Sequence, residues 1–212
     1  GLKKQPMTFP DARPADAAAF AEAYFQALAK AAVSVDRARV QAAAALLEQA
    51  HRRGASIFAC GNGGSAAIAN HLACDHCKGV AADTALRPRV HSLSANVEII
   101  TAIANDLSYA DVFAHQLRNL GRPGDVLVTI SASGDSENIV RAADAAKSGG
   151  MEVIALTGFK GGRSARVADV NVHVEADNYG VIEDVHQSLM HILAQWLRLA
   201  HMDAALIPQR KF

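Results

Sequence analysis

The chain has 212 residues, which is long enough for one domain with a full hydrophobic core. Half of the residues are hydrophobic and few are aromatic, a composition typical of an alanine- and valine-rich α/β protein. Basic and acidic residues are equal in number, so the formal net charge is zero, which argues against nucleic-acid and membrane-surface partners because these usually require a basic excess.

The sequence also indicates the compartment. No stretch approaches the roughly 20 apolar residues of a membrane helix, and the polar, proline-containing segment 1–14 has no apolar signal-peptide core. Three cysteines in no regular framework are typical of a reduced protein. We therefore expect a cytoplasmic protein with an N-terminal tail over 1–14 and a single domain over 15–212.

Two helices are predicted first, and strands and helices alternate after Gly54, which would end the second helix. The predicted helices are 16–32, 35–53, 65–78, 96–104, 108–119, 136–148, a short helix after the loop 158–162, and 181–201. The predicted strands are 55–60, 88–94, 125–130, 151–157 and 169–175. This alternation predicts an α/β three-layer sandwich, in which helices cover both faces of a five-stranded parallel sheet and an N-terminal helical hairpin precedes it.

Two short loops follow predicted strands and precede predicted helices. The first is Gly61-Asn62-Gly63-Gly64-Ser65, and the second, 131–136, contains three serines. Free backbone N–H groups and the positive end of the next helix would point to one place in each loop, which suits an anion. Hydroxyl groups rather than lysines line both loops. They therefore favour a small phosphate monoester over a nucleoside triphosphate.

Each loop also has a plainer interpretation. A tight strand-to-helix turn needs glycines for its backbone geometry alone, and Asp135 or Ser136 could serve only as a helix N-cap. However, Ser131, Ser133 and Ser136 offer more hydroxyls than one cap needs. Both loops also stand at the C-terminal ends of parallel strands, where ligands of open α/β sheets bind. The pair of loops therefore favours a phosphate site.

Four side chains on two predicted helices suggest a metal site. His71 and Asp75 lie four residues apart and share one helix face, and Glu183 and His191 lie eight apart on the last helix. Two imidazoles and two carboxylates are suitable ligands for Zn²⁺ or a similar ion. Polarity of an exposed helix surface is the alternative, and for any single histidine it is the simpler explanation. Asn105 and Asp106 end another predicted helix and could form only its C-terminal turn, but they also follow the second predicted strand, on the ligand side of the sheet.

Taken together, these motifs resemble the sugar isomerase (SIS) domain. Within it they resemble the phosphoheptose isomerase branch, which converts sedoheptulose 7-phosphate to D-glycero-D-manno-heptose 7-phosphate. The resemblance extends from the N-terminal helices through the last helix and implies a flavodoxin-like fold. It rests on the segments 61–65, 101–106, 131–136, 155–158 with 161–162, and 183–193.

The resemblance implies a role for each matching residue. Asp75 and His191 would share the acid–base chemistry. The substrate- and phosphate-binding residues would be Asn62, Gly63, Gly64, Ser65, Asn105, Asp106, Ser131, Ala132, Ser133, Ser136 and Glu183, with Ala132 standing where the family usually has threonine. The ligands of one Zn²⁺ would be His71, Asp75, Glu183 and His191.

Two positions depart from the family's pattern. Asp75 stands where the family has glutamate, and Glu183 stands where it has glutamine. Both remain oxygen ligands, and the additional negative charge favours a divalent cation. Asp75 is one methylene shorter than glutamate, so the carboxylate that would act as base lies closer to its own helix. The longer side chain of Glu183 could extend to the position that Asp75 does not reach.

The expected activity is a metal-assisted aldose–ketose isomerisation of sedoheptulose 7-phosphate through an enediolate, in a heptose pathway such as that of lipopolysaccharide or capsule. The alternatives are an isomerase for another phosphosugar, a phosphosugar-binding regulator, and a scaffold that binds the replication initiator. Scaffold relatives lose the histidine and carboxylate of the first helix, whereas this chain keeps His71 and Asp75. The resemblance also implies a homotetramer with sites completed between subunits.

Overall fold

The computed structural model describes residues 8–212, so the predicted tail over 1–14 lies partly outside the described residues. Its centre is a five-stranded sheet in the order β2-β1-β3-β4-β5, in which all neighbouring strands are parallel. The strands are β1 (Ile57–Gly61), β2 (Val90–Ser92), β3 (Val126–Ile130), β4 (Glu152–Thr157) and β5 (Val170–His173). The predicted five-stranded parallel sheet is confirmed, and its order is that of flavodoxin-like folds.

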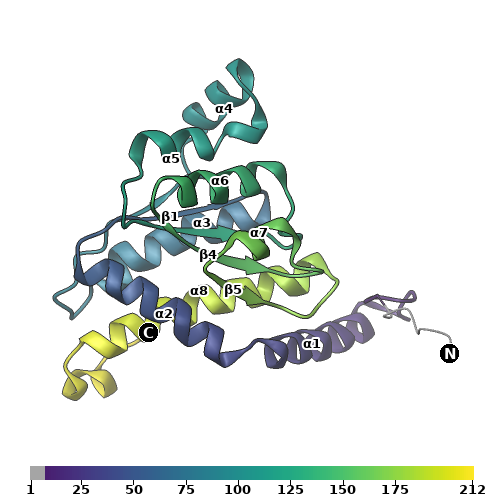
Figure 1. Cartoon of the computed structure of the whole chain (residues 1–212). Coiled ribbons are helices and arrows are strands. Elements are labelled where there is room, and N and C mark those ends of the chain that lie inside the picture. Colours follow the sequence, from purple (N-terminus) through teal and green to yellow (C-terminus); the bar gives the residue numbers. More distant parts are fainter. Residues whose placement is uncertain (1–7) are drawn as a thin grey trace.

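Helices cover both faces of the sheet (Figure 1). The α-helices are α1 (Ala17–Ser34), α2 (Arg37–Arg52), α3 (Gly64–Cys74), α4 (Val97–Asp106), α5 (Ala114–Leu120), α6 (Glu137–Ser148), α7 (Gly162–Val167) and α8 (Tyr179–His201). One layer contains α2, α3 and α8, the other contains α5, α6 and α7, and α4 projects outward from the second layer. The predicted three-layer sandwich is therefore confirmed.

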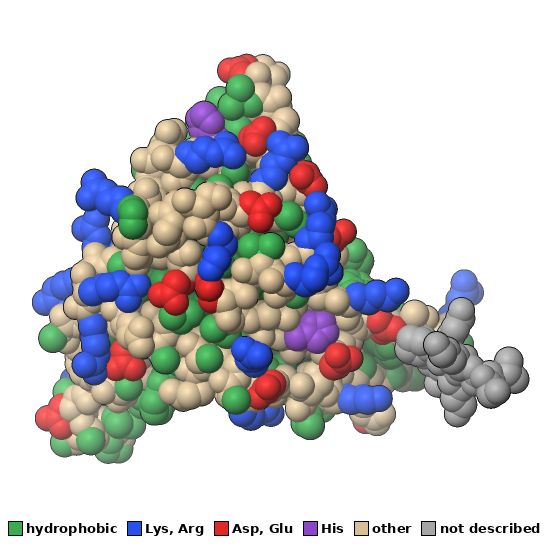
Figure 2. Space-filling view, in the orientation of Figure 1, with side chains coloured by type: hydrophobic (Ala, Val, Ile, Leu, Met, Phe, Trp, Pro, Cys, Tyr) green, Lys and Arg blue, Asp and Glu red, His purple; other side chains and the backbone are tan. Residues whose placement is uncertain are grey.

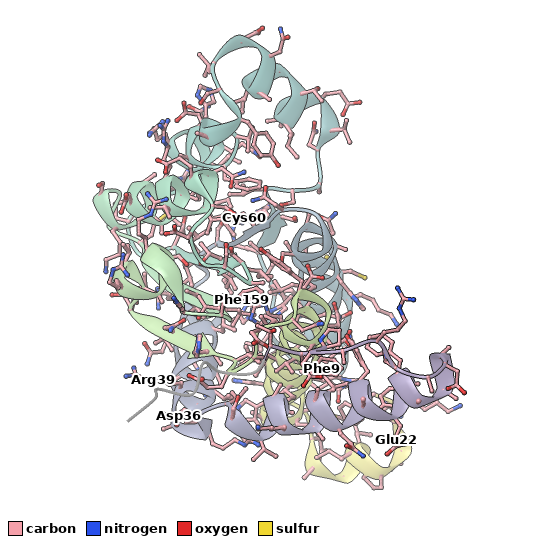
Figure 3. The ribbon with its side chains drawn as sticks, turned by 90° about the vertical axis from the view of Figure 1, so that its right-hand side faces the viewer. Phe9, Glu22, Asp36, Arg39, Cys60 and Phe159 are labelled. Carbon is pink, nitrogen blue, oxygen red and sulfur yellow. The ribbon has the colours of Figure 1, made fainter. Side chains whose placement is uncertain are left out.

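The strands alternate their side chains between two buried cores. Ile57 and Ala59 of β1 face the core under α3 and α8, and Phe58 and Cys60 face the core under α5 and α6. Cys60 accordingly lies deep between the two helical layers (Figure 3). Because both faces of the sheet are covered, its central strands β1 and β3 are buried along their whole length and are almost entirely apolar. Within residues 8–212, no helix is long and apolar enough to cross a membrane.

Both predicted N-terminal helices are present, but they run end to end rather than folding back as the predicted hairpin (Figure 1). Asp36 begins α2, because its carboxylate accepts a hydrogen bond from the N–H of Ala38. Each helix instead packs against α8, and Tyr24 of α1 donates a hydrogen bond to Asp184. Contact with α8 thus replaces contact between the two helices.

Two other predicted helices are divided. The helix predicted over 65–78 is α3 followed by a π-helical turn, Asp75–Val80, which buries His76 and Val80. The helix predicted over 108–119 consists of a 3₁₀ turn, Tyr109–Asp111, followed by α5. Its Ser108 hydroxyl bonds the Asp111 carboxylate at 2.8 Å, a local contact that competes with a continuous helix.

His186 of α8 is fully buried against the end of β4. Its Nε2–H donates to the carbonyl oxygen of Thr157 at 2.9 Å, and its Nδ1 is buried without a partner among the described residues. The pKa of His186 is lowered to about 4, chiefly by burial and also by nearby His173, while the hydrogen bond to Thr157 opposes the shift. Protonation of His186 would place a charge where water does not reach.

We therefore expect His186 to make the fold sensitive to acid. The unfolded chain binds a proton at this residue below about pH 6.5, whereas the native protein binds it only near pH 4. The free energy of unfolding should thus fall as the pH is lowered through this window, by up to about 1.4 kcal/mol per pH unit from this residue. Urea unfolding between pH 7 and pH 4.5 measures the slope.

The informative variant is His186→Gln, which retains an N–H donor for the Thr157 carbonyl but does not titrate. It should show a shallower dependence of unfolding free energy on pH than the native protein. His115→Gln, on the partly exposed side of α5, is the matched control and should leave the slope unchanged. Parallel curves for His186→Gln and the native protein would contradict the expectation.

Candidate functional site

The two predicted loops stand side by side at one edge of the sheet. Gly61, the last residue of β1, pairs with Ile130, the last residue of β3, so both loops leave the sheet at the same level. The chain order reverses between these two strands, at the place where open α/β sheets bind ligands. The structure therefore brings the loops together as the sequence predicts.

An amide pair connects the first loop with the start of α6, the helix that follows the second loop. The side chains of Asn62 and Asn138 exchange two hydrogen bonds of 2.8 Å, and the Tyr109 hydroxyl donates a third to the Asn62 oxygen. Asn138, in the first turn of α6, is almost completely buried. The sequence analysis did not identify Asn138 or Tyr109, because residues distant in the sequence meet at Asn62 only in the folded chain.

The serine loop presents hydroxyl groups at the start of α6. The Ser131 hydroxyl accepts the N–H of Gly134 at 3.0 Å, and the Ser133 hydroxyl accepts that of Asp135 at 3.3 Å. Ser136 occupies the N-cap position of α6, yet its side chain makes no capping bond. A cap alone therefore does not explain this serine, and its hydroxyl is available to a ligand.

The surroundings of the serine loop are partly buried and polar. Ala132 is buried, and its carbonyl accepts the N–H of Gly158 at 2.8 Å, so it can meet a ligand only through its backbone. Arg163 bonds the Asp135 carboxylate at 2.7 Å and lowers its pKa. A hollow of about 900 Å³ extends from Ser133 to the residues that begin α8. The loop thus has open space beside it.

Three of the four predicted metal ligands come together between α3 and α8. His71 Nε2 lies 3.1 Å from one carboxylate oxygen of Asp75, and His191 Nε2 lies 3.6 Å from the other. One donor atom from each residue falls within 4.8 Å of the others. Two imidazoles and one carboxylate with room for a further ligand are the donor set of many catalytic zinc sites, so these residues fit a divalent ion.

Gln187 joins this group, although the sequence analysis gave it no role. Its side-chain amide donates to His71 Nδ1 at 3.0 Å and lies 3.1 Å from His191 Nε2. The signal that could have revealed it is its position four residues before His191, on the same helix face. Gln187 orients both imidazoles and connects α3 with α8.

Glu183, the fourth predicted ligand, is not part of the His71–Asp75–His191 group. Its carboxylate instead lies beside Gly64 at the start of α3, where a Cβ atom on that glycine would be 2.7 Å from each carboxylate oxygen. Partial burial raises the pKa of Glu183, and the neighbouring Asp184 raises it further. Glu183 therefore lies at the loop end of the site.

The remaining predicted residues take two different positions. Ser65, the last residue of the first loop, is buried in the first turn of α3. Asn105 and Asp106 end the projecting helix α4, are exposed, and share a hydrogen bond of 2.8 Å with each other. Within residues 8–212, no hydrogen bond joins either of them to the two loops.

The charge distribution agrees with a small ligand. On the face shown in Figure 2, basic and acidic side chains are interspersed rather than gathered into one basic surface. Opposite charges also pair on the surface, as in Lys147 with Asp169 and Arg141 with Asp111. This face therefore lacks the continuous basic surface with which proteins usually bind nucleic acid.

Comparison with known proteins identifies relatives with this architecture. The SIS domain matches residues 21–158. The chain is 40% identical to the phosphoheptose isomerase of Alteromonas mediterranea over 159 residues, which cover 74% of this chain and 80% of that protein. It is 39% identical to the phosphoheptose isomerase of Mycobacterium tuberculosis over 181 residues, which cover 83% and 88%.

A solved structure agrees with these sequence relatives. The phosphoheptose isomerase of Neisseria gonorrhoeae superposes with a TM-score of 0.76 at 38% identity, over 85% of this chain and 95% of that protein. Similarity in sequence and fold thus extends over most of both proteins. The chain belongs to the SIS domain family, among the relatives of phosphoheptose isomerases.

Proposed function

We propose that this protein is a phosphoheptose isomerase that interconverts sedoheptulose 7-phosphate and D-glycero-D-manno-heptose 7-phosphate through an enediolate, with the help of a divalent ion. The observation that carries the proposal is the His71–Asp75–His191 group on the two helices beside a pair of anion-binding loops. The named relatives at about 40% identity support the reaction class. The extent of the domain, 15–212, remains a prediction.

The loops supply the phosphate site in this proposal. The hydroxyls of Ser131, Ser133 and Ser136, with the backbone N–H groups at the start of α6, would hold the phosphate. Binding energy from the phosphate would position the sugar, because remote contacts can orient the reacting carbons. The other proposed substrate contacts are Asn62, Gly63, Gly64, Ser65, Asn105, Asp106, Ala132 and Glu183.

The His71–Asp75–His191 group supplies the reacting end. Zn²⁺ held there would polarise the sugar carbonyl as a Lewis acid. We propose that Asp75 and His191 hold and transfer the proton on the sugar oxygens, because the carboxylate and the imidazole are 3.6 Å apart. A carboxylate that holds an ion through one oxygen retains the second oxygen for this task.

The proposal is tested by the isomerisation of sedoheptulose 7-phosphate with purified protein. We expect turnover that is lost when a chelator removes the ion and restored when Zn²⁺ is added back. Mg²⁺ serves as the control, because it prefers oxygen ligands and should restore little. Activity on another phosphosugar alone would contradict the substrate, and full activity in the chelated protein would contradict the role of the ion.

We also propose a homotetramer in a reduced, cytoplasmic setting. Several apolar side chains are exposed on the projecting helix α4 and on α8, among them Val97, Ile99, Ile192 and Trp196. Exposed apolar surface of this kind marks contact with another chain. The three cysteines are free, with Cys60 buried and Cys74 and Cys77 exposed, which agrees with a reducing compartment.

A further inference from the structure

Gln187 contacts both imidazoles of the His71–Asp75–His191 group through a single atom. Its amide nitrogen lies 3.0 Å from His71 Nδ1 and 3.1 Å from His191 Nε2. An amide nitrogen carries two N–H groups and accepts no hydrogen bond. Both ring nitrogens therefore accept a hydrogen bond from Gln187, and neither of them carries a proton in this arrangement.

The contact with Gln187 fixes which nitrogen of His71 carries the ring proton. A neutral imidazole has one N–H, and at His71 it must be at Nε2, because Nδ1 accepts from Gln187. Nε2 lies 3.1 Å from an oxygen of Asp75, which is a suitable acceptor. The two contacts agree, and His71 is thus held at both ring nitrogens, by a donor on one side and by an acceptor on the other.

A divalent ion shared by His71 and Asp75 would require the opposite arrangement. The ion would take the lone pair of the ring nitrogen that faces Asp75, which is Nε2, and the ring proton, exchanging through water, would be on Nδ1. Nδ1–H would then face the N–H groups of Gln187. The same amide covers His191 Nε2, the nitrogen that lies 3.6 Å from Asp75. An ion and the N–H groups of Gln187 therefore compete for both imidazoles.

A half-turn of the Gln187 amide removes this conflict. The terminal torsion of glutamine is broad and roughly two-fold, so the amide nitrogen and oxygen can exchange places at little cost. Among residues 8–212, Oε1 of Gln187 has no hydrogen-bond partner, so the turn breaks only the two bonds to the imidazoles. Oε1 would then accept the Nδ1–H of His71. A metal-binding histidine almost always donates its other ring N–H to such an acceptor.

We propose that Gln187 is a positioning residue of the metal site, whose amide donates to both imidazoles before an ion binds and turns to accept the Nδ1–H of His71 once the ion is held. This role rests on the metal-assisted part of the proposed function. Gln187 acts through His71 and His191 and touches neither the sugar nor the ion. A glutamine suits this position because its amide offers a donor in one setting and an acceptor in the other, whereas a carboxylate or an ammonium group offers only one of these.

The affinity for Zn²⁺, measured by competition with a chelator of known affinity, tests the role of Gln187. Gln187→Leu has nearly the same size but can neither donate nor accept, so it should bind Zn²⁺ about 10- to 100-fold more weakly than the native protein. Gln187→Glu keeps an acceptor for the Nδ1–H of His71 and should bind Zn²⁺ at least as tightly as the native protein. Melting temperatures of the zinc-free proteins show that each variant is folded.

NMR of protein with ¹⁵N-labelled histidine supplies a signature that a merely structural role would not produce. In the native protein, Zn²⁺ should move the ring proton of His71 from Nε2 to Nδ1. The Nδ1–H of the zinc-loaded protein should be protected from exchange with water in the native protein and in Gln187→Glu, because an oxygen accepts it. In Gln187→Leu this N–H has lost its acceptor and should exchange rapidly.

Gln41→Leu is the matched control. It makes the same replacement at an exposed position of α2, outside the His71–Asp75–His191 group. Its affinity for Zn²⁺ and the exchange of its His71 N–H should match those of the native protein.

Each result decides between the alternatives. Weaker zinc binding in Gln187→Leu alone, with rapid exchange of the His71 Nδ1–H, would support the role of Gln187. Native affinity in Gln187→Leu, or an equal loss of affinity in Gln187→Leu and Gln187→Glu, would overturn it and leave the isomerase function in place. A native protein that binds no Zn²⁺ would overturn the metal-assisted function itself, and the role of Gln187 with it.

Discussion

Asp75→Ala should lower kcat for isomerisation by about a thousandfold or more, the largest loss that we expect from one side chain. Its carboxylate faces both His71 and His191, at 3.1 and 3.6 Å. The substitution removes a proposed ligand of the ion together with a proposed acid–base group, and each such role contributes orders of magnitude to a rate. Steady-state kinetics with bound zinc quantified would measure both effects.

Two variants accompany Asp75→Ala. Asp144→Ala removes an exposed carboxylate from α6 and should leave kcat unchanged. Asp75→Glu retains an acid, one methylene longer, and should recover a large part of the rate because an oxygen ligand is restored. Full isomerase activity in Asp75→Ala would show that neither the ion nor the acid–base chemistry depends on this residue.

Gly134→Ala should destabilise the protein by about 2–5 kcal/mol and disrupt the serine loop. Gly134 has a φ of 64°, in the left-handed region, and an added Cβ would overlap the carbonyl oxygen of Gly161. The left-handed conformation costs a non-glycine residue about 1–2 kcal/mol, and overpacking adds about 1–3 kcal/mol. Urea unfolding would measure the loss of stability, and KM for the phosphosugar the loss of phosphate binding.

Gly54→Ala separates the cost of the left-handed conformation from the cost of overpacking. Gly54 also has a left-handed conformation, with a φ of 70°, but an added Cβ there meets no atom within 4 Å. We expect it to cost only the conformational part, about 1–2 kcal/mol, and to leave KM unchanged. Equal losses for the two variants would contradict the close packing of the serine loop against Gly161.

Much of the fold follows from local sequence. The apolar runs that form β1 and β3, and the glycine- and serine-rich loops after them, are complete within short segments, so their periodicity and turn chemistry predict them directly. The division of the helix predicted over 108–119, which falls after Asp111, was not predicted, because the apolar pattern continues across it. The hairpin was also wrong, since the sequence does not reveal that α8 offers both N-terminal helices a better surface.

The candidate site, like the fold, could be predicted only in part from the sequence. His71 and Asp75 share a helix face by their spacing, and resemblance to a family placed His191 opposite them. Helix spacing alone does not show that Gln187 bonds both imidazoles, or that Glu183 faces Gly64, because these contacts depend on how α3 and α8 pack. Tertiary packing, rather than residue type, decides which of several polar side chains reaches the site.

The amide pair between Asn62 and Asn138 has a consequence for substrate choice. It joins the first loop to the start of the helix that follows the second loop, and the two loops already stand on hydrogen-bonded neighbouring strands, so the opening between them has a fixed width. Phosphosugars of different chain length share the same phosphate group, so a phosphate site of fixed width in these loops would accept them equally. Under the proposed function, discrimination by length would then fall to side chains outside the loops, such as those that α8 presents to α3, and evolution toward a longer or shorter sugar should proceed there while the loops stay unchanged.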